Sequence, residues 1–207
     1  MHIFYFDTFN IFITFASQIF NLNLNTMNGF DFYRIKTEWT SERDGGELSK
    51  VKTEELVYAS SYTDAESTAI DIAENQQRSK FGSINYEIIK TKINELVYTP
   101  VLKQESELTN GLICNYFEEG EDTGVGLYCV RVMFIEVDEK TGKEKRSNEN
   151  IYIPASSINH ATELVRQYLK KVGEVRDFIV RDTKFDKTSA IFWPVNVHQE
   201  KVKLAEI

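Results

Sequence analysis

The chain has 207 residues and a formal charge of −8, with 24 Lys and Arg against 32 Asp and Glu. Its hydrophobic content of 42% is enough to build a core, which excludes a disordered chain, and three Pro with ten Gly exclude a collagen-like one. Two Cys do not make a disulfide framework, so we expect a reduced compartment, the cytoplasm of a bacterial host.

Residues 1–26 differ from the rest of the chain, because they hold six of the 14 Phe and a single charged residue, Asp7. No Lys or Arg precedes Arg34, so the segment lacks the basic start of a signal peptide. Its apolar stretch is too short and too interrupted for a transmembrane helix. One interpretation is that translation starts at Met27; the others are an apolar packing arm or a weak membrane-surface segment.

Two stretches of the chain, residues 27–100 and 127–194, repeat one pattern and predict two β-β-α-β units. Apolar and polar side chains alternate in Phe32–Trp39 as they do in a half-buried strand, and Leu127–Phe134 matches this segment at an offset of 95. Glycine-containing turns follow both segments. We therefore predict an α+β fold, in which the duplicated units pack as a pseudo-twofold pair of antiparallel sheets, each covered by one helix.

One helix in each repeat is predicted from apolar residues at i, i+4, i+7 and i+8, which share a helix face. At an offset of 96 these residues are Ala65, Ala69, Ile72 and Ala73 in the first repeat and Ala161, Val165, Tyr168 and Leu169 in the second. Thr63 and Asn159 are the expected N-cap residues. A third strand is expected after each helix, at Tyr86–Ile93 and at Phe178–Phe185.

Residues 101–126 connect the repeats and carry one Lys against six carboxylates. We expect an extra strand at Gly111–Phe117 and an acidic, glycine-rich loop at Glu118–Asp122. Residues 195–207 are expected to form a C-terminal tail. Trp193, just before that tail, is the aromatic residue that we expect to be partly exposed.

Candidate catalytic and metal-binding residues are scarce. The three His have no metal-ligand spacing, and they are His2, His160 and His198. Cys114 and Cys129 are expected to be small hydrophobic residues. The sequence contains no glycine-rich phosphate loop. We therefore predict a protein that is not an enzyme, holds no metal and uses no cofactor, and we identify no small-molecule substrate.

Basic side chains on the predicted strands indicate a binding surface for single-stranded nucleic acid, since cations beside aromatic rings attract phosphates and stack bases. Arg34 and Lys36 lie on the polar face of the first strand, and Arg131 repeats the Lys36 position. The full candidate set is Arg34, Lys36, Arg131, Lys143, Lys145 and Arg146. The alternative is a protein-interaction module that docks through the acidic connector or a sheet edge. In a third interpretation, the lysines only keep a hairpin soluble.

Three segments resemble a small family of domains of unknown function found in gut anaerobes, their phages and mobile elements. The segments are Met27–Phe30 leading into Tyr33, Leu56–Glu66, and Phe134–Lys145 with its Asp-Glu-Lys-Thr-Gly-Lys stretch. The resemblance covers residues 27–194. It implies an accessory protein of a phage or mobile element, and it carries no catalytic residues across.

Overall fold

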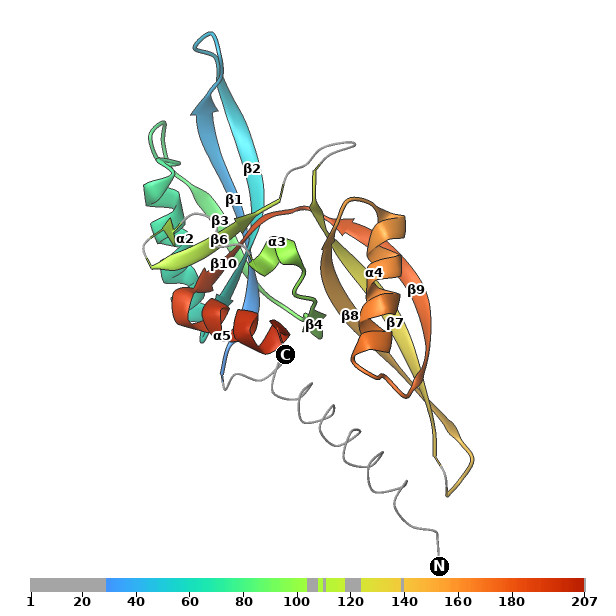
Figure 1. Ribbon diagram of the computed structural model, residues 1–207. Coiled ribbons are helices and arrows are strands. Elements are labelled where there is room, and N and C mark those ends of the chain that lie inside the picture. The colour runs from blue at the N-terminus through green and yellow to red at the C-terminus, as the bar shows by residue number, and fades with distance from the viewer. Residues whose placement is uncertain (1–28, 104–107, 110, 118–123, 139, 207) are drawn as a thin grey trace, which may run out of the picture.

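The computed structural model describes residues 29–103, 108–109, 111–117, 124–138 and 140–206 (Figure 1). The predictions for residues 1–26 and for the acidic loop Glu118–Asp122 lie outside these residues. The described part is α+β, with two mixed sheets and four helices. None of its helices is long and apolar enough to cross a membrane.

The first sheet has six strands in the order β3-β1-β2-β10-β6-β5. Their bounds are β1 Asp31–Glu42, β2 Leu48–Ala59, β3 Asn85–Thr91, β5 Leu108–Thr109, β6 Leu112–Tyr116 and β10 Thr188–Pro194. Helix α2 (Tyr62–Asn75) packs on one face, where its predicted apolar residues meet Tyr33, Ile35 and Val57. We call β1, β2, α2 and β3 the first unit.

The second sheet has four strands in the order β4-β8-β7-β9, with α4 (Ile158–Lys171) on one face. Their bounds are β4 Glu95–Leu96, β7 Gly126–Val137, β8 Glu144–Ala155 and β9 Asp177–Asp186. We call β7, β8, α4 and β9 the second unit. In Figure 1 the β1–β2 hairpin and the β7–β8 hairpin project from opposite ends of the molecule.

Each sheet contains one parallel pair, so the prediction of purely antiparallel sheets is wrong. The reason is an exchange of strands between the units. Strand β4, which follows the first unit, pairs with β8 through Leu96 and Tyr152. Strand β10, which follows the second unit, pairs with β2 through Ile191 and Leu56. The strand that follows each unit therefore pairs in the sheet of the other unit.

A central core lies between the two units and includes Phe32, Tyr58, Leu127, Tyr152 and Trp193. The expectation that Trp193 is partly exposed is wrong, because its side chain is 0% exposed. It lies on β10, inside the first sheet, and its Nε1 donates to Asn115 Oδ1 at 3.0 Å. After it the chain continues as helix α5 (Val195–Glu206), and the short helix α3 (Pro100–Lys103) closes the same region.

Both long helices start two residues earlier than predicted. The N-cap residues are Ser61 and Ser157, whose side chains accept hydrogen bonds from the amides of Asp64 and His160. These serines precede the expected caps, Thr63 and Asn159. A serine oxygen satisfies a free amide of the first turn as well as a threonine or asparagine oxygen does, and here the earlier residue is the cap.

The segments that follow α2 and α4 also share a contact, in which an arginine lies over an aromatic ring. The Arg78 guanidinium lies 4.4 Å from the ring centroid of Trp39, and the Arg176 guanidinium lies 3.9 Å from that of Phe134. Each arginine also pairs with a carboxylate on the neighbouring strand. In both units, therefore, an arginine in the segment after the helix packs on an aromatic ring of the sheet and pairs with a carboxylate of the next strand.

Candidate functional site

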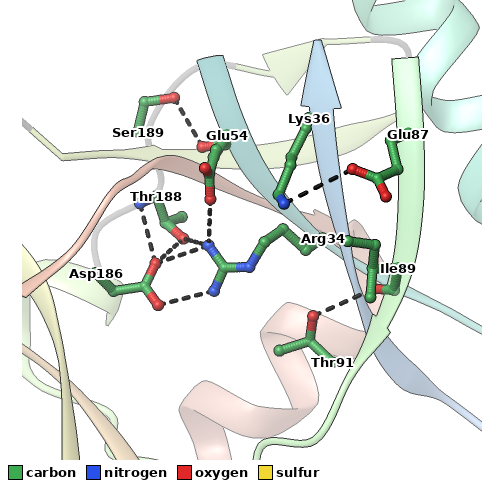
Figure 2. Close-up of polar contacts among 9 residues, drawn as sticks. All are labelled: Arg34, Lys36, Glu54, Glu87, Ile89, Thr91, Asp186, Thr188 and Ser189. Atoms are coloured by element: carbon green, nitrogen blue, oxygen red, sulfur yellow. Dashed lines mark hydrogen bonds and ion pairs between the residues drawn. The ribbon is translucent and has the colours of Figure 1, made fainter. Parts of the chain in front are cut away.

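Arg34 does not lie free on the sheet but joins the two units. Figure 2 shows its side chain reaching from β1 to Asp186 at the end of β9. Its Nη1 and Nη2 donate to the two carboxylate oxygens of Asp186 at 2.9 and 2.8 Å, and Nη1 also donates to Glu54 at 3.1 Å. The Arg34 and Asp186 side chains are only 13% and 11% exposed. This arginine is therefore committed to a structural contact.

The environment of Asp186 favours its ionised form. Burial by itself raises the pKa of Asp186, but hydrogen bonds from Arg34 and Thr188 outweigh it, so the pKa lies below its ordinary value of 3.8. The backbone amide of Thr188 donates to the same carboxylate at 3.0 Å. The contact between the units thus depends on a charged Asp186.

We expect Asp186→Asn to lower the free energy of unfolding at pH 7 by about 3 kcal/mol, because the nearly buried Arg34 loses its charged partner. The folded-state pKa is the lower one, so the stabilisation is complete above about pH 5 and is lost as the pH falls through the folded-state pKa. Urea unfolding should therefore give a smaller difference at pH 3 than at pH 7. A difference that does not change with pH would contradict this role. The control is Glu54→Gln, on a more exposed partner, with an expected loss below about 1 kcal/mol.

Lys36 lies beside Arg34 on the same face, where acidic side chains balance the basic ones. Lys36 pairs with Glu87 on β3 at 3.7 Å (Figure 2). Further along the face, Lys52 and Lys50 both donate to Glu38 at 2.8 and 2.9 Å. These hydrogen bonds lower the pKa of Glu38 to about 2. This face of the first sheet is therefore a ladder of paired charges.

The remaining predicted cations lie on the second sheet and on both of its faces. Arg131 is exposed on the face away from α4, opposite Asp182 in the register of β7 and β9. Arg146 lies on the same face and pairs with Glu144. Lys145 lies on the α4 side of the sheet, and Lys143 lies next to the hairpin turn. The structure thus does not gather the six predicted residues into one patch.

A pocket of about 410 Å³ lies where the first sheet meets β4 and α5, and we call it the junction pocket. This volume is within the range of about 300–1,000 Å³ found for small-ligand sites. Its lining residues are Phe30, Asp31, Phe32, Tyr58, Lys90, Thr91, Lys92, Ile93, Glu95, Leu96 and Lys201. They come from five separate stretches of the chain, so no local sequence pattern could have revealed them.

Aromatic rings form one wall of the junction pocket. The Phe30 ring stacks on Tyr58, with centroids 5.4 Å apart and planes 20° from parallel. The Phe32 ring lies 4.7 Å from Tyr58 in a tilted arrangement. Phe32 and Tyr58 are only 8% and 4% exposed, so the half-buried Phe30 ring is the part of this wall that a ligand can reach.

Three lysines complete the junction pocket. Lys201 on α5 is only 7% exposed, and its Nζ lies 5.0 Å from the Tyr58 ring centroid. Burial lowers the pKa of Lys201, although Glu95 and Glu200 favour its charged form. Lys90 pairs with Asp31, whereas Lys92 is exposed. An anion that enters the pocket would stabilise the buried ammonium group of Lys201.

Groups with obvious catalytic chemistry do not gather elsewhere in the described residues. Within them no three His, Cys, Asp or Glu side chains are placed to hold a metal ion. Cys114 is buried and Cys129 is half-buried, and the two do not form a disulfide. The junction pocket is therefore the site with the most convergent chemistry.

A family model with the description "Domain of unknown function (DUF4494)" matches residues 31–194, from the start of β1 to the end of β10. No curated protein matches the chain.

Proposed function

We propose that this chain, which belongs to the DUF4494 family, is a non-enzymatic binding protein for single-stranded nucleic acid. The proposal is based on the junction pocket. We place it in the bacterial cytoplasm as an accessory protein of a phage or mobile element. That setting rests on the resemblance of residues 27–194 described above.

One observation carries the proposal, namely that a stacked aromatic pair and three lysines line the same pocket. Bases stack on aromatic side chains whatever their sequence, and phosphates are attracted to ammonium groups. The junction pocket offers both within one cavity. On the predicted sheet face Arg34 and Lys36 are both members of ion pairs, whereas in the pocket Lys90 pairs with Asp31 and Lys92 is exposed.

We also propose that the two units arose by duplication and form a pseudo-twofold pair. The exchanged strands support this, because Leu96 and Ile191 are one repeat offset apart and so are their partners, Tyr152 and Leu56. The equal serine caps and the arginines stacked on rings support it as well. In this alignment Pro154 takes the place of Tyr58. The aromatic wall is therefore a property of the first unit.

The test is binding of a fluorescein-labelled oligothymidylate, followed by fluorescence anisotropy at low and high salt. We expect Lys92→Glu to weaken binding about tenfold at low salt and to flatten the salt dependence, because one phosphate contact becomes a repulsion. The matched control is Lys170→Glu, an equal charge reversal at an exposed site on α4, which should bind like the wild type.

Two further charge reversals distinguish the pocket from the predicted sheet face. Lys36→Glu and Arg131→Glu should leave affinity unchanged if the pocket is the site. A loss of binding confined to these two variants would instead favour the sheet face. If the wild type does not bind at low salt, the nucleic-acid proposal is wrong. The edge strand β9, which exposes Ile179 and Phe185, is then the surface to test for protein docking.

A further inference from the structure

The size of the junction pocket limits how a strand can enter it. A cavity of about 410 Å³ is of small-ligand size. Proteins that bind along a single strand instead use an open groove that spans about 4–16 nucleotides. The junction pocket therefore has room for a single nucleotide unit and not for a continuous run of them.

The inner end of the pocket is closed by the core between the units. Phe32 and Leu96, which line it, are buried members of the central core, and Lys201 is almost fully buried beside them. A strand cannot pass through this wall and leave on the other side. A chain end can place both a base and its phosphate inside, whereas a base within a strand must flip out of the strand and leaves its phosphates at the mouth.

The charges that line the pocket favour the phosphate that is found at a chain end. Lys201 lies at the inner wall beside Glu95, and Lys92 lies at the exposed side, so a ligand that fills the pocket has a cation at each end. A terminal phosphate monoester carries a charge of about −1.5 to −2 at pH 7. A phosphodiester inside a strand carries a single negative charge. The buried ammonium group of Lys201, beside Glu95, gains more from the doubly charged group.

We propose that the junction pocket recognises the phosphorylated end of a single strand. The terminal base packs against the Phe30–Tyr58 pair, and the terminal phosphate monoester accepts hydrogen bonds from Lys201 and Lys92. This inference rests on the proposed function and specifies its ligand. The chemistry is the same for a 5′-phosphate and a 3′-phosphate.

The experiment uses the full chain and four internally labelled oligothymidylates of equal length. One carries a 5′-phosphate, one a 3′-phosphate, one has hydroxyl groups at both ends, and one is a closed circle. We expect one phosphorylated strand to bind at least tenfold more tightly than the hydroxyl-ended strand, and the circle to bind most weakly. The two phosphorylated strands show which end is recognised.

The outcomes separate this inference from the proposed function. A circle that binds as tightly as the phosphorylated strands, or equal affinity for phosphorylated and hydroxyl ends, would overturn end recognition while nucleic-acid binding stands. No binding of any strand at low salt would overturn both. In Lys201→Met the preference for a terminal phosphate should disappear. If that variant unfolds, Lys92→Gln at the exposed side should reduce the same preference severalfold.

Discussion

Arg78→Met should lower the free energy of unfolding by about 4 kcal/mol, the loss expected when one partner of a buried ion pair is removed. The Arg78 and Glu55 side chains are 4% and 2% exposed, and Arg78 Nη2 donates to Glu55 Oε1 at 2.6 Å. The other carboxylate oxygen of Glu55 is buried and has no partner among the described residues. Methionine fills similar space but leaves this carboxylate buried and unpaired. Urea unfolding followed by circular dichroism measures the loss.

Arg176→Met is the matched control, because Arg176 has the corresponding place in the second unit. It stacks on Phe134, but its side chain is 28% exposed and its partner Glu149 also reaches solvent. The Glu149 carboxylate left behind can be hydrated, whereas Glu174 is only 10% exposed, so we expect a smaller loss of about 2 kcal/mol. If the two variants lose equal amounts of stability, burial does not determine what the Arg78–Glu55 pair contributes to the free energy of unfolding.

Trp193→Ala should destabilise the protein by a similar amount, about 4 kcal/mol, since it opens a large cavity in the core between the units. The indole packs against the rings of Phe32, Tyr58 and Tyr98 at centroid distances of 5.5 to 5.7 Å. Thermal or urea unfolding should show one cooperative transition, shifted as a whole, because strand β10 belongs to the first sheet and follows the second unit.

Trp193→Phe is the control for this cavity. It keeps most of the ring contacts and removes the hydrogen bond to Asn115, so we expect a loss of about 1–2 kcal/mol. Two separate transitions in Trp193→Ala would contradict the view that β10 couples the units.

The strands and helices of each unit were largely predictable, because each depends on a local pattern. Alternation over Phe32–Trp39 marks β1, and the spacing of Ala65, Ala69 and Ile72 marks the buried face of α2. Strand β10 was harder, because it is buried on both faces and so lacks the alternation that would have shown Trp193 to be internal.

The partners of these elements were not predictable from the same patterns. A strand's periodicity does not say which neighbour it takes, so the parallel pairs of β4 and β10 were missed. Arg34 was correctly placed on the polar face of β1, but the residue that binds it, Asp186, is far away in sequence. The sequence therefore could not show whether this cation is open to a ligand.

The junction pocket was invisible in the sequence for a related reason. Its most buried cation, Lys201, lies in what the sequence indicated only as a tail, and it meets Tyr58 through the packing of α5. No spacing rule connects the two residues. Only the assembled core brings them together.

The exchange of strands also determines when this protein can finish folding during synthesis. The first unit leaves the ribosome early, but β10, the parallel neighbour of β2, is among the last strands to be made. Until then the β2 edge stays unpaired, with Leu56 and Val57 exposed to other nascent chains. We expect that translation stalled before residue 188 leaves a product that aggregates or is degraded.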